Sequence, residues 1–395
     1  MNDMIGSDKV ASRSFGSLQL LQYEQPDASW MDDKAAGIWK YAALLPPVAS
    51  GNRLSLGEGR TPLIRSVSLE KRLGIGELYF KYEGGNPTGS YKDRIATIGL
   101  SWALEQRRTA CVGTTSGNAG AAVAAYAARA GLPYHLYVLE HMAEAKLTQV
   151  LAYGANVRRV AEFGTSPEVG DRVFRHVLNA AVTHDWELMV TAFRFNTHAM
   201  EGVKTIAYEI AEQLGGCPDT VYAPAGGAGL YVGIWKGFDE WQRFSLGDGR
   251  KPHMVAVQPE GCSNIVRAYE QGALQPLPGA STSLISGLQV PNPPDGEAAL
   301  AIMDAGDGSA LAVSDDEIWQ AQRLLAREEG IFCEPAGAAA VAGLIRTCQQ
   351  RQQMGERIVC LISGVGFKDF ASITAMTQDE TVPLLTVSDL NAPYE

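Results

Sequence analysis

The chain has 395 residues, of which 46% are hydrophobic and 19% are charged, and its net charge is −11. This composition is typical of a globular protein and excludes an intrinsically disordered chain. The length exceeds what one hydrophobic core usually supports, so it predicts two domains. An acidic chain without a basic tract is a poor partner for nucleic acid or for an anionic membrane surface.

The six cysteines form no CxxC pair, which predicts neither a disulfide framework nor a zinc site and indicates a reducing compartment. Residues 1–14 mix both charges around no apolar core, unlike a signal peptide. No uncharged apolar stretch reaches the about 18 residues that a membrane helix needs. We therefore expect a cytoplasmic protein that binds no membrane and no metal.

The predicted elements follow an N-terminal arm, residues 1–35, that has few periodic apolar positions. Short apolar runs then predict strands at 78–83, 110–115, 134–139, 156–161, 188–193, 220–225, 253–259 and 358–363. Helical patterns lie between most of these runs, for example at 120–130 and 199–214. Such alternation predicts an α/β fold with mainly parallel sheets that are covered on both faces.

Three glycine-rich segments directly follow predicted strands: TTSGNAG after ACVG, PAGGAG after TVYA, and SGVGFKD after IVCLI. The carboxyl ends of parallel strands form the ligand crevice of such a fold, so these segments predict one shared site. The Pro-, Gly- and Ser-rich stretch 272–308 is either a domain linker or an ordered loop near that site. We favour the ordered loop, because a long loop inside a compact domain is usually functional.

Lys92 lies in the run NPTGSYKDRIA, residues 86–96, where a predicted strand gives way to a helix. An amine at the start of a helix, behind a turn, suits a lysine that forms a Schiff base and then acts as a base. The alternative is an ordinary exposed lysine beside Asp93.

The segment PAGGAG contains Gly226, Gly227, Ala228 and Gly229 directly before a predicted helix. Backbone N–H groups of such a segment point into one concavity, and the helix dipole adds positive potential, as in a phosphate site. A plain tight turn explains this segment alone equally well. The spacing fits neither a Walker A loop nor the GxGxxG pattern of a dinucleotide site.

Polar residues in the other two segments also have two interpretations. Ser116 or Asn118 would cap the following helix, or would help to bind a substrate carboxylate and a cofactor ring hydroxyl. Ser363 would bond the backbone at the strand end, or would face a pyridine nitrogen that a neutral hydroxyl does not keep protonated. For each residue alone, the structural interpretation is the simpler one.

These motifs, together with GIFCEPAGAAAVAGL at 330–344, occur in the order found in fold-type II, tryptophan synthase beta-like enzymes that use pyridoxal 5'-phosphate. Within that family the chain most resembles the threonine synthases, and GIWKYAALLPP and LGEGRTPLIR are similar to their N-terminal signature. The resemblance implies two doubly wound domains. A large domain, 1–70 and 190–395, would bind the cofactor phosphate, and a small mobile domain, 71–189, would carry the asparagine loop.

The resemblance also implies a role for each candidate residue. Lys92 would form the Schiff base with pyridoxal phosphate and later move the proton at the substrate Cα. The cofactor would contact Asn118 through its ring oxygen, Ser363 through its ring nitrogen and, through its phosphate, Gly226, Gly227, Ala228, Gly229 and Leu230. The substrate would contact Thr115, Ser116 and Ala119 through its carboxylate and Lys81 through a distal anion.

The implied activity is that of a lyase or synthase that eliminates a β- or γ-substituent from a small L-amino acid, in a homodimer. The nearest named reaction converts O-phosphohomoserine and water to threonine and phosphate. Other eliminations remain open, namely a dehydratase acting on threonine or serine and an ammonia-lyase acting on diaminopropionate. A β-replacement synthase and a non-catalytic cofactor-binding sensor remain open as well.

The chain departs from the threonine synthases at the substrate end. They usually carry arginine where this chain has Ala199, and asparagine where it has Gly227 and Leu230. Without a guanidinium fork a phosphate binds more weakly, unless Arg194 or His198 replaces the missing arginine.

Overall fold

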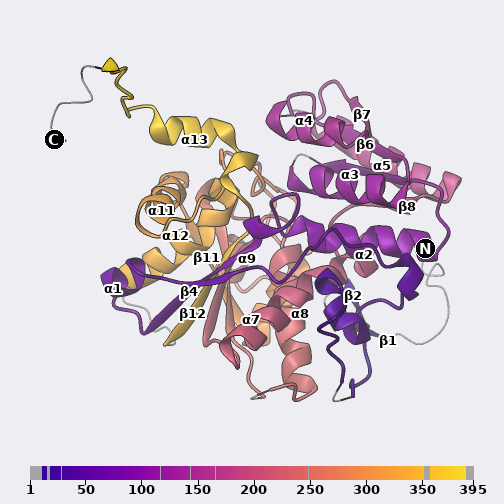
Figure 1. The fold of residues 1–395 in the computed structure, drawn as a ribbon, viewed down its shortest axis with the longest axis horizontal. Helices are drawn as coiled ribbons and strands as arrows, with labels where there is room; N and C mark the ends of the chain where they lie inside the picture. The colour runs from indigo at the N-terminus through magenta and orange to yellow at the C-terminus, as the bar shows by residue number, and fades with distance from the viewer. Residues whose placement is uncertain are drawn as a thin grey trace.

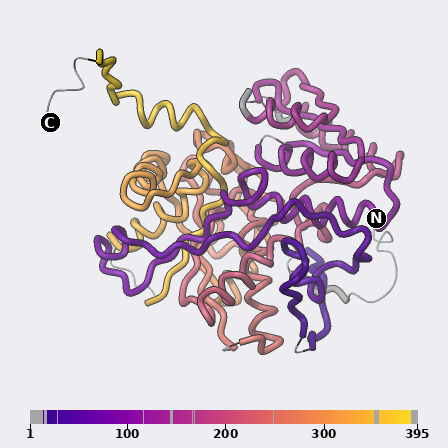
Figure 2. The backbone as a smooth tube through the Cα atoms, in the orientation of Figure 1, coloured from indigo at the N-terminus to yellow at the C-terminus, as the bar shows by residue number. Residues whose placement is uncertain are grey.

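The computed structural model describes residues 11–15, 18–27, 29–115, 117–142, 144–164, 166–247, 249–350 and 356–387. These residues form two α/β units, each built around its own sheet (Figure 1). Residues of about 110–190, drawn in magenta in Figure 2, gather on one side of the molecule. None of the described helices is long and apolar enough to cross a membrane.

The larger sheet has six strands in the order β11-β10-β9-β12-β4-β3. Its strands are β3 (Leu63–Arg65), β4 (Glu77–Tyr82), β9 (Thr220–Pro224), β10 (His253–Pro259), β11 (Gly308–Val313) and β12 (Arg357–Ile362). Neighbouring strands are parallel except for the antiparallel pair β3 and β4. Every residue of β9 is buried, as expected for a central parallel strand that helices cover on both faces.

The smaller sheet has four parallel strands in the order β7-β6-β5-β8. They are β5 (Cys111–Thr115), β6 (Tyr134–Val138), β7 (Asn156–Arg159) and β8 (Glu187–Leu188). The predicted strand 188–193 is wrong over most of its length, because only Glu187–Leu188 pairs with β5. The chain leaves the sheet after the Met189 N–H, which still donates to the Val112 carbonyl at 2.8 Å.

Helices lie around both sheets. Around the smaller sheet and between the units they are α2 (Lys92–Glu105), α3 (Asn118–Ala130), α4 (Glu144–Ala152) and α5 (Pro167–His184). Those of the rest of the described chain are α1 (Leu69–Leu73), α6 (Thr197–Met200), α7 (Thr205–Leu214), α8 (Gly229–Arg243), α9 (Asn264–Glu270), α10 (Gly296–Asp304), α11 (Asp315–Glu328), α12 (Pro335–Gln349) and α13 (Phe370–Thr377). Short 3-10 turns are η1 (Gly37–Leu44), η2 (Ser50–Asn52), η3 (Glu83–Gly85), η4 (Glu201–Lys204), η5 (Glu260–Cys262) and η6 (Gly366–Lys368).

Helix α2 joins the two units because it is apolar on two faces. Ile95 and Ile98 pack in the core of the larger unit. Ala96 and Leu100, one turn apart on another face, pack with α3 and the smaller sheet. A helix that is buried on both sides has a fixed position, and Lys92 is its first residue.

The N-terminal segment is more ordered than its sequence predicts. Strands β1 (Ala11–Phe15) and β2 (Leu18–Gln22) form an antiparallel hairpin. Leu18 and Leu20 are buried in the larger core. Residues 1–10 of the predicted arm lie outside the described residues.

The predicted division into domains stays a prediction, and the sheets bear on its first boundary. Strand β4, which the prediction assigns to the small domain, pairs with β12 and β3 in the six-stranded sheet. A boundary at residue 70 would therefore divide one sheet.

Candidate active site

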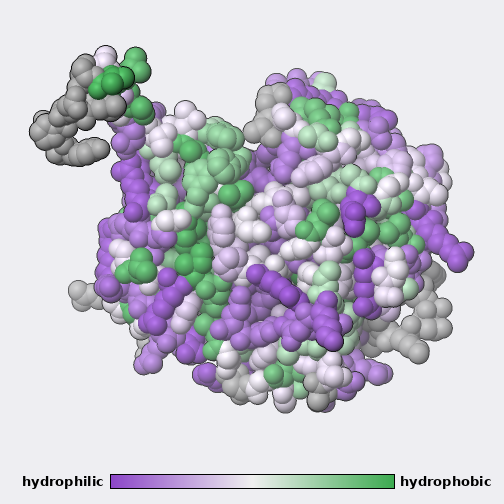
Figure 3. Space-filling view, viewed as in Figure 1, coloured by the Kyte–Doolittle hydropathy of each residue, from purple (hydrophilic) through white to green (hydrophobic). Residues whose placement is uncertain are grey.

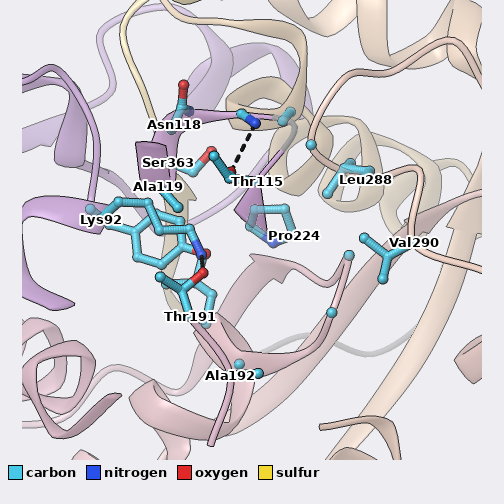
Figure 4. Close-up of a pocket in the computed structure, with 18 of the residues that line it drawn as sticks. Lys92, Thr115, Asn118, Ala119, Thr191, Ala192, Pro224, Leu288, Val290 and Ser363 are labelled. Carbon is cyan, nitrogen blue, oxygen red and sulfur yellow. Dashed lines mark hydrogen bonds between the residues drawn. The ribbon is translucent and has the colours of Figure 1, made fainter. Parts of the chain in front are cut away.

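A cavity of about 270 Å³ lies where the carboxyl ends of strands from both sheets come together. Its walls include Thr114 and Thr115 at the end of β5, Pro224 at the end of β9, and Ser363 directly after β12 (Figure 4). This is the expected place for a ligand in an open parallel sheet.

Lys92 enters the cavity from the start of α2. Its Nζ donates a hydrogen bond to the Thr191 hydroxyl at 2.8 Å and lies 4.7 Å from the centroid of the Tyr91 ring. Figure 4 shows Lys92 and Thr191 pointing toward each other. Sequence analysis did not identify Thr191, because it assigned residues 188–193 to a strand.

The start of α2 is held from behind by Arg94, which is fully buried. Its guanidinium binds Glu83 at 2.7 and 2.9 Å and Glu209 at 2.7 Å through two nitrogens. Two such forks fix the orientation of the helix. In the run Lys92–Asp93–Arg94, the lysine therefore faces the cavity while the arginine anchors the helix.

Lys81 does not lie in the cavity. It is fully buried, and its Nζ donates to Glu209 at 2.7 Å, to the Thr61 carbonyl at 2.8 Å and to Gln213 at 2.9 Å. These bonds use all three ammonium hydrogens. The predicted contact with a distal substrate anion is therefore not supported by its position. Lys81, Glu83, Arg94 and Glu209 are called the Arg94 network below.

The segment Gly226–Leu230 lines the cavity and leads into α8. Ala228 precedes the helix with φ 68° and ψ −8°, a left-handed conformation that is costly for a residue with a side chain. Successive N–H groups in such a turn form an anion-binding nest at the positive end of the helix. A Cβ on Gly226 would lie 2.6 Å from the Gly287 carbonyl oxygen, so only glycine fits there.

The asparagine loop forms the opposite wall. Thr115 Oγ1 accepts a hydrogen bond from the Gly117 N–H at 3.0 Å, and Ala119 also lines the cavity. Asn118 is the first residue of α3, and its Nδ2 donates to the Glu334 carboxylate at 2.8 and 3.0 Å. Ser116 lies outside the described residues.

Two polar atoms of this wall are buried without a partner among the described residues. They are Asn118 Oδ1 and Thr114 Oγ1. Such orphaned groups are rare in native proteins and call for a ligand or a water molecule.

Ser363 is buried at the end of β12, and its carbonyl accepts a hydrogen bond from the Tyr91 N–H at 3.1 Å. This bond ties the residue before Lys92 to the central strand. Ser363 thus lies in the same cavity as Lys92, Asn118 and the Gly226–Leu230 segment.

Two buried carboxyl groups, one in the cavity wall and one next to Gly229, were missed by sequence analysis. Glu334 lines the cavity, and burial raises its pKa, although the Lys146 charge and the bond from Asn118 oppose the rise. Asp295 accepts hydrogen bonds from the Phe193 and Arg194 N–H groups at 3.0 and 3.1 Å. Burial raises the pKa of Asp295 to about 6.

The predicted loop 272–308 contributes to the site over part of its length. Gly287, Leu288, Val290 and Pro294 line the cavity, which confirms an ordered loop at this position. Within this stretch, Gly296–Asp304 instead form helix α10.

The proposed replacements for a distal arginine lie outside the cavity lining. Ala199, the position at which the threonine synthases usually carry arginine, is buried against Gly99. A Cβ added to Gly99 would lie only 3.1 Å from the Ala199 methyl group. His198 stacks on Trp102 with ring centroids 4.2 Å apart. Arg194 lines a neighbouring surface groove that shares Val190 and Pro294 with the cavity. Among the described residues of the cavity wall, Lys92 is the only cation.

The site agrees with comparisons to known proteins. Residues 54–364 match the family described as "Pyridoxal-phosphate dependent enzyme". The chain is 39% identical to a threonine synthase of Methanocaldococcus jannaschii over 337 residues, 84% of this chain and 81% of the relative. It is 35% identical to a threonine synthase of Methanosarcina acetivorans over 362 residues, 90% of this chain and 86% of the relative.

Solved structures share the fold. Diaminopropionate ammonia lyase from Escherichia coli matches with a TM-score of 0.69 at 17% identity, covering 94% of this chain and 97% of that chain. Threonine deaminase isoform 2 from Solanum lycopersicum matches with a TM-score of 0.68 at 19% identity, covering 95% of this chain and 100% of that chain.

The fold, the lysine and the glycine-rich cradle therefore define a pyridoxal phosphate-dependent enzyme of fold type II. Within that class, the chain belongs to the threonine synthase-like family.

The residues present fit pyridoxal phosphate. The cradle before α8 suits its phosphate, and the orphaned Asn118 Oδ1 and Thr114 Oγ1 mark a polar wall that lacks a partner. Lys92 Nζ would supply the amine, and Ser363 lies at the end of the central strand. When bound, the cofactor supplies a ring that stabilises negative charge at the substrate Cα.

Proposed function

We propose that this protein eliminates a β- or γ-substituent from a small L-amino acid, with conversion of O-phosphohomoserine and water to threonine and phosphate as the first candidate reaction. The observation that carries the proposal is the position of Lys92 Nζ, which shares one cavity with Asn118, Ser363 and the Gly226–Leu230 cradle. The threonine synthase relatives, at 33–39% identity, support the choice of substrate.

In this proposal each part of the cavity wall has one task. Lys92 Nζ moves the proton at the substrate Cα, and the Thr191 hydroxyl, 2.8 Å away, orients it. N–H groups at the start of α3, with Thr115 and Ala119, bind the substrate carboxylate. The apolar side chains of Leu230, Leu288 and Val290 exclude water from the reacting atoms.

The test follows the products of the purified holoenzyme. With O-phosphohomoserine we expect phosphate and threonine in equal amounts, and no ammonia. Lys92→Ala should abolish this turnover, and borohydride should then no longer fix the cofactor to the peptide that contains position 92. Labelling at another lysine would contradict the proposal.

A second candidate is net elimination from an amino acid without a distal anion, such as dehydration of threonine or serine, or loss of ammonia from diaminopropionate. The specific observation is the shortage of positive charge, because Lys92 is the only cation among the described cavity residues. A 2-oxo acid and ammonia from threonine, serine or diaminopropionate, with no phosphate released from O-phosphohomoserine, would favour this candidate.

The proposal includes a homodimer in the cytoplasm. The segment after α13 leaves the body of the molecule with exposed apolar side chains, which appear green near the C-terminus in Figure 3. Val382, Leu384 and Val387 are 94%, 100% and 84% exposed, and a second copy would cover them. Light scattering of the purified protein should give twice the chain mass. The cysteine pattern of the sequence, which has no CxxC pair, supports a reducing location.

A further inference from the structure

The two units meet across the rim of the cavity through a small group of hydrogen bonds. Asn118 on α3 donates to Glu334 at 2.8 Å, Lys146 on α4 donates to Ser286 at 2.7 Å, and Lys368 in η6 donates to Gln149 on α4 at 2.7 Å. Each bond joins the unit of the four-stranded sheet to the other unit.

Glu334 is the centre of this group. It lies at the N-cap of α12, is 3% exposed, and has the Lys146 and Lys368 charges near it. Its N–H donates to the Gly364 carbonyl at 3.1 Å, next to Ser363. A Cβ on Gly364 would lie 2.4 Å from Glu334 Oε1, so the absence of a side chain makes room for the carboxylate.

The bond to Glu334 also fixes which way the Asn118 amide is turned. A carboxylate accepts hydrogen bonds and does not donate them, so Nδ2 faces Glu334 and Oδ1 is left without a partner. A side chain held this way presents the same atoms each time a ligand enters the cavity.

We propose that Glu334 is a positioning residue, which holds the Asn118 amide and the start of α3 in the geometry that binds the cofactor. The inference rests on the proposed function only in that pyridoxal phosphate occupies the cavity. It concerns binding of the cofactor and not the choice of substrate.

The test measures the affinity of the apoprotein for pyridoxal phosphate and the absorbance band of the bound cofactor, with no substrate present. We expect Glu334→Leu to weaken binding by about 10- to 100-fold and to shift the band, since a hydrogen bond to a charged group is lost. Glu334→Gln should recover most of the affinity, because its amide oxygen still accepts from Asn118. Glu334→Asp keeps the charge, but its side chain is one methylene shorter and does not reach Asn118 Nδ2. It should therefore weaken cofactor binding as Glu334→Leu does, while the buried site stays polar.

A double-mutant cycle separates positioning from general stability. If Glu334 acts through Asn118, then Asn118→Ala combined with Glu334→Leu should bind the cofactor no more weakly than Asn118→Ala alone. Glu329→Leu is the matched control, because Glu329 accepts several hydrogen bonds from residues 66–69, outside the cavity lining. That variant should lower stability and leave cofactor affinity unchanged.

Three results would overturn the inference: wild-type affinity in both Glu334→Leu and Glu334→Asp, losses that multiply in the double variant, or an equal loss in Glu329→Leu. Wild-type holoenzyme that binds the cofactor but releases no phosphate from O-phosphohomoserine would contradict the first candidate reaction and leave this inference standing.

Discussion

The Arg94 network and the carboxyl groups at the cavity are both buried, yet their electrostatics are opposite. In the network the carboxylates lie within hydrogen-bonding distance of a cation. Burial would raise the pKa of Glu209, but the Arg94 and Lys81 charges hold it well below its ordinary value. Glu334 in the cavity wall and Asp295 next to Gly229 instead accept hydrogen bonds from neutral N–H groups, and their pKa values are raised.

The difference indicates which buried polar groups find their partners within the protein and which do not. The Arg94 network satisfies its own charges and fixes the position of α2. The cavity keeps an orphaned amide oxygen, an orphaned hydroxyl and a strained turn, which are features of a site that binds a further group.

The largest expected effect comes from breaking the network with Arg94→Met. Two buried carboxylates would lose their main partner, which costs about 3–5 kcal/mol of unfolding free energy. Urea denaturation measures this loss. The control is Arg72→Met, because the Arg72–Glu328 pair is partly exposed and contributes about 0–1 kcal/mol. Similar losses in the two variants would contradict the contrast between the regions.

Replacing Asp295 by asparagine should change the dependence of stability on pH. Its folded pKa is raised from 3.8 to about 6, so between these values the unfolded chain loses the proton first. The contribution of Asp295 to the unfolding free energy is therefore greatest below about pH 4. It falls as the pH rises and is constant above about pH 6. The unfolding free energy of the wild type, minus that of Asp295→Asn, should fall by about 3 kcal/mol over this range. A flat difference would show that Asp295 titrates normally.

Adding a methyl group in the cradle should affect the cofactor and not the network. Gly226→Ala would place a Cβ 2.6 Å from the Gly287 carbonyl oxygen and displace one of the two segments. We expect at least about 10-fold weaker binding of pyridoxal phosphate, or about 1.4 kcal/mol, in a fluorescence titration. An unchanged affinity would mean that the backbone at Gly287 moves away from the added methyl group without weakening cofactor binding.

The smallest change in stability is expected at Ala228, whose backbone has the left-handed conformation. Ala228→Gly should stabilise the apoprotein by about 0.5–1 kcal/mol, because glycine adopts φ 68° without a steric penalty. The same substitution at Ala128, exposed in helix α3, should destabilise by about 1 kcal/mol. Thermal unfolding compares the two signs, and a destabilised Ala228→Gly would contradict the presence of strain.

Local patterns predicted much of the fold and of the cavity. Apolar runs located the parallel strands, and the rule that ligands bind at their carboxyl ends brought Lys92, Asn118, Gly226 and Ser363 to one place. The half-buried strand β11 was missed, because its apolar run ALAV is only four residues long and directly follows the Pro-, Gly- and Ser-rich stretch.

Partners that are distant in sequence were not predicted. Lys81 and Glu209 are 128 positions apart, and no local pattern reveals that they pair. The same limit applies to Glu334 and Asn118, which are 216 positions apart. A charged residue next to a motif is as compatible with a buried ion pair as with a ligand contact, and only the tertiary structure decides between them.

The two-sided packing of α2 has a mechanical consequence. A helix that belongs to both cores is the natural pivot between them, and a rotation displaces atoms near its axis least. A shift of the α3–α4 side against the rest would change the distance between Asn118 and Glu334, while the amine at the head of α2 stays with both cores. Lys92 therefore lies on the one described helix whose residues pack in both the larger core and the core of the smaller sheet.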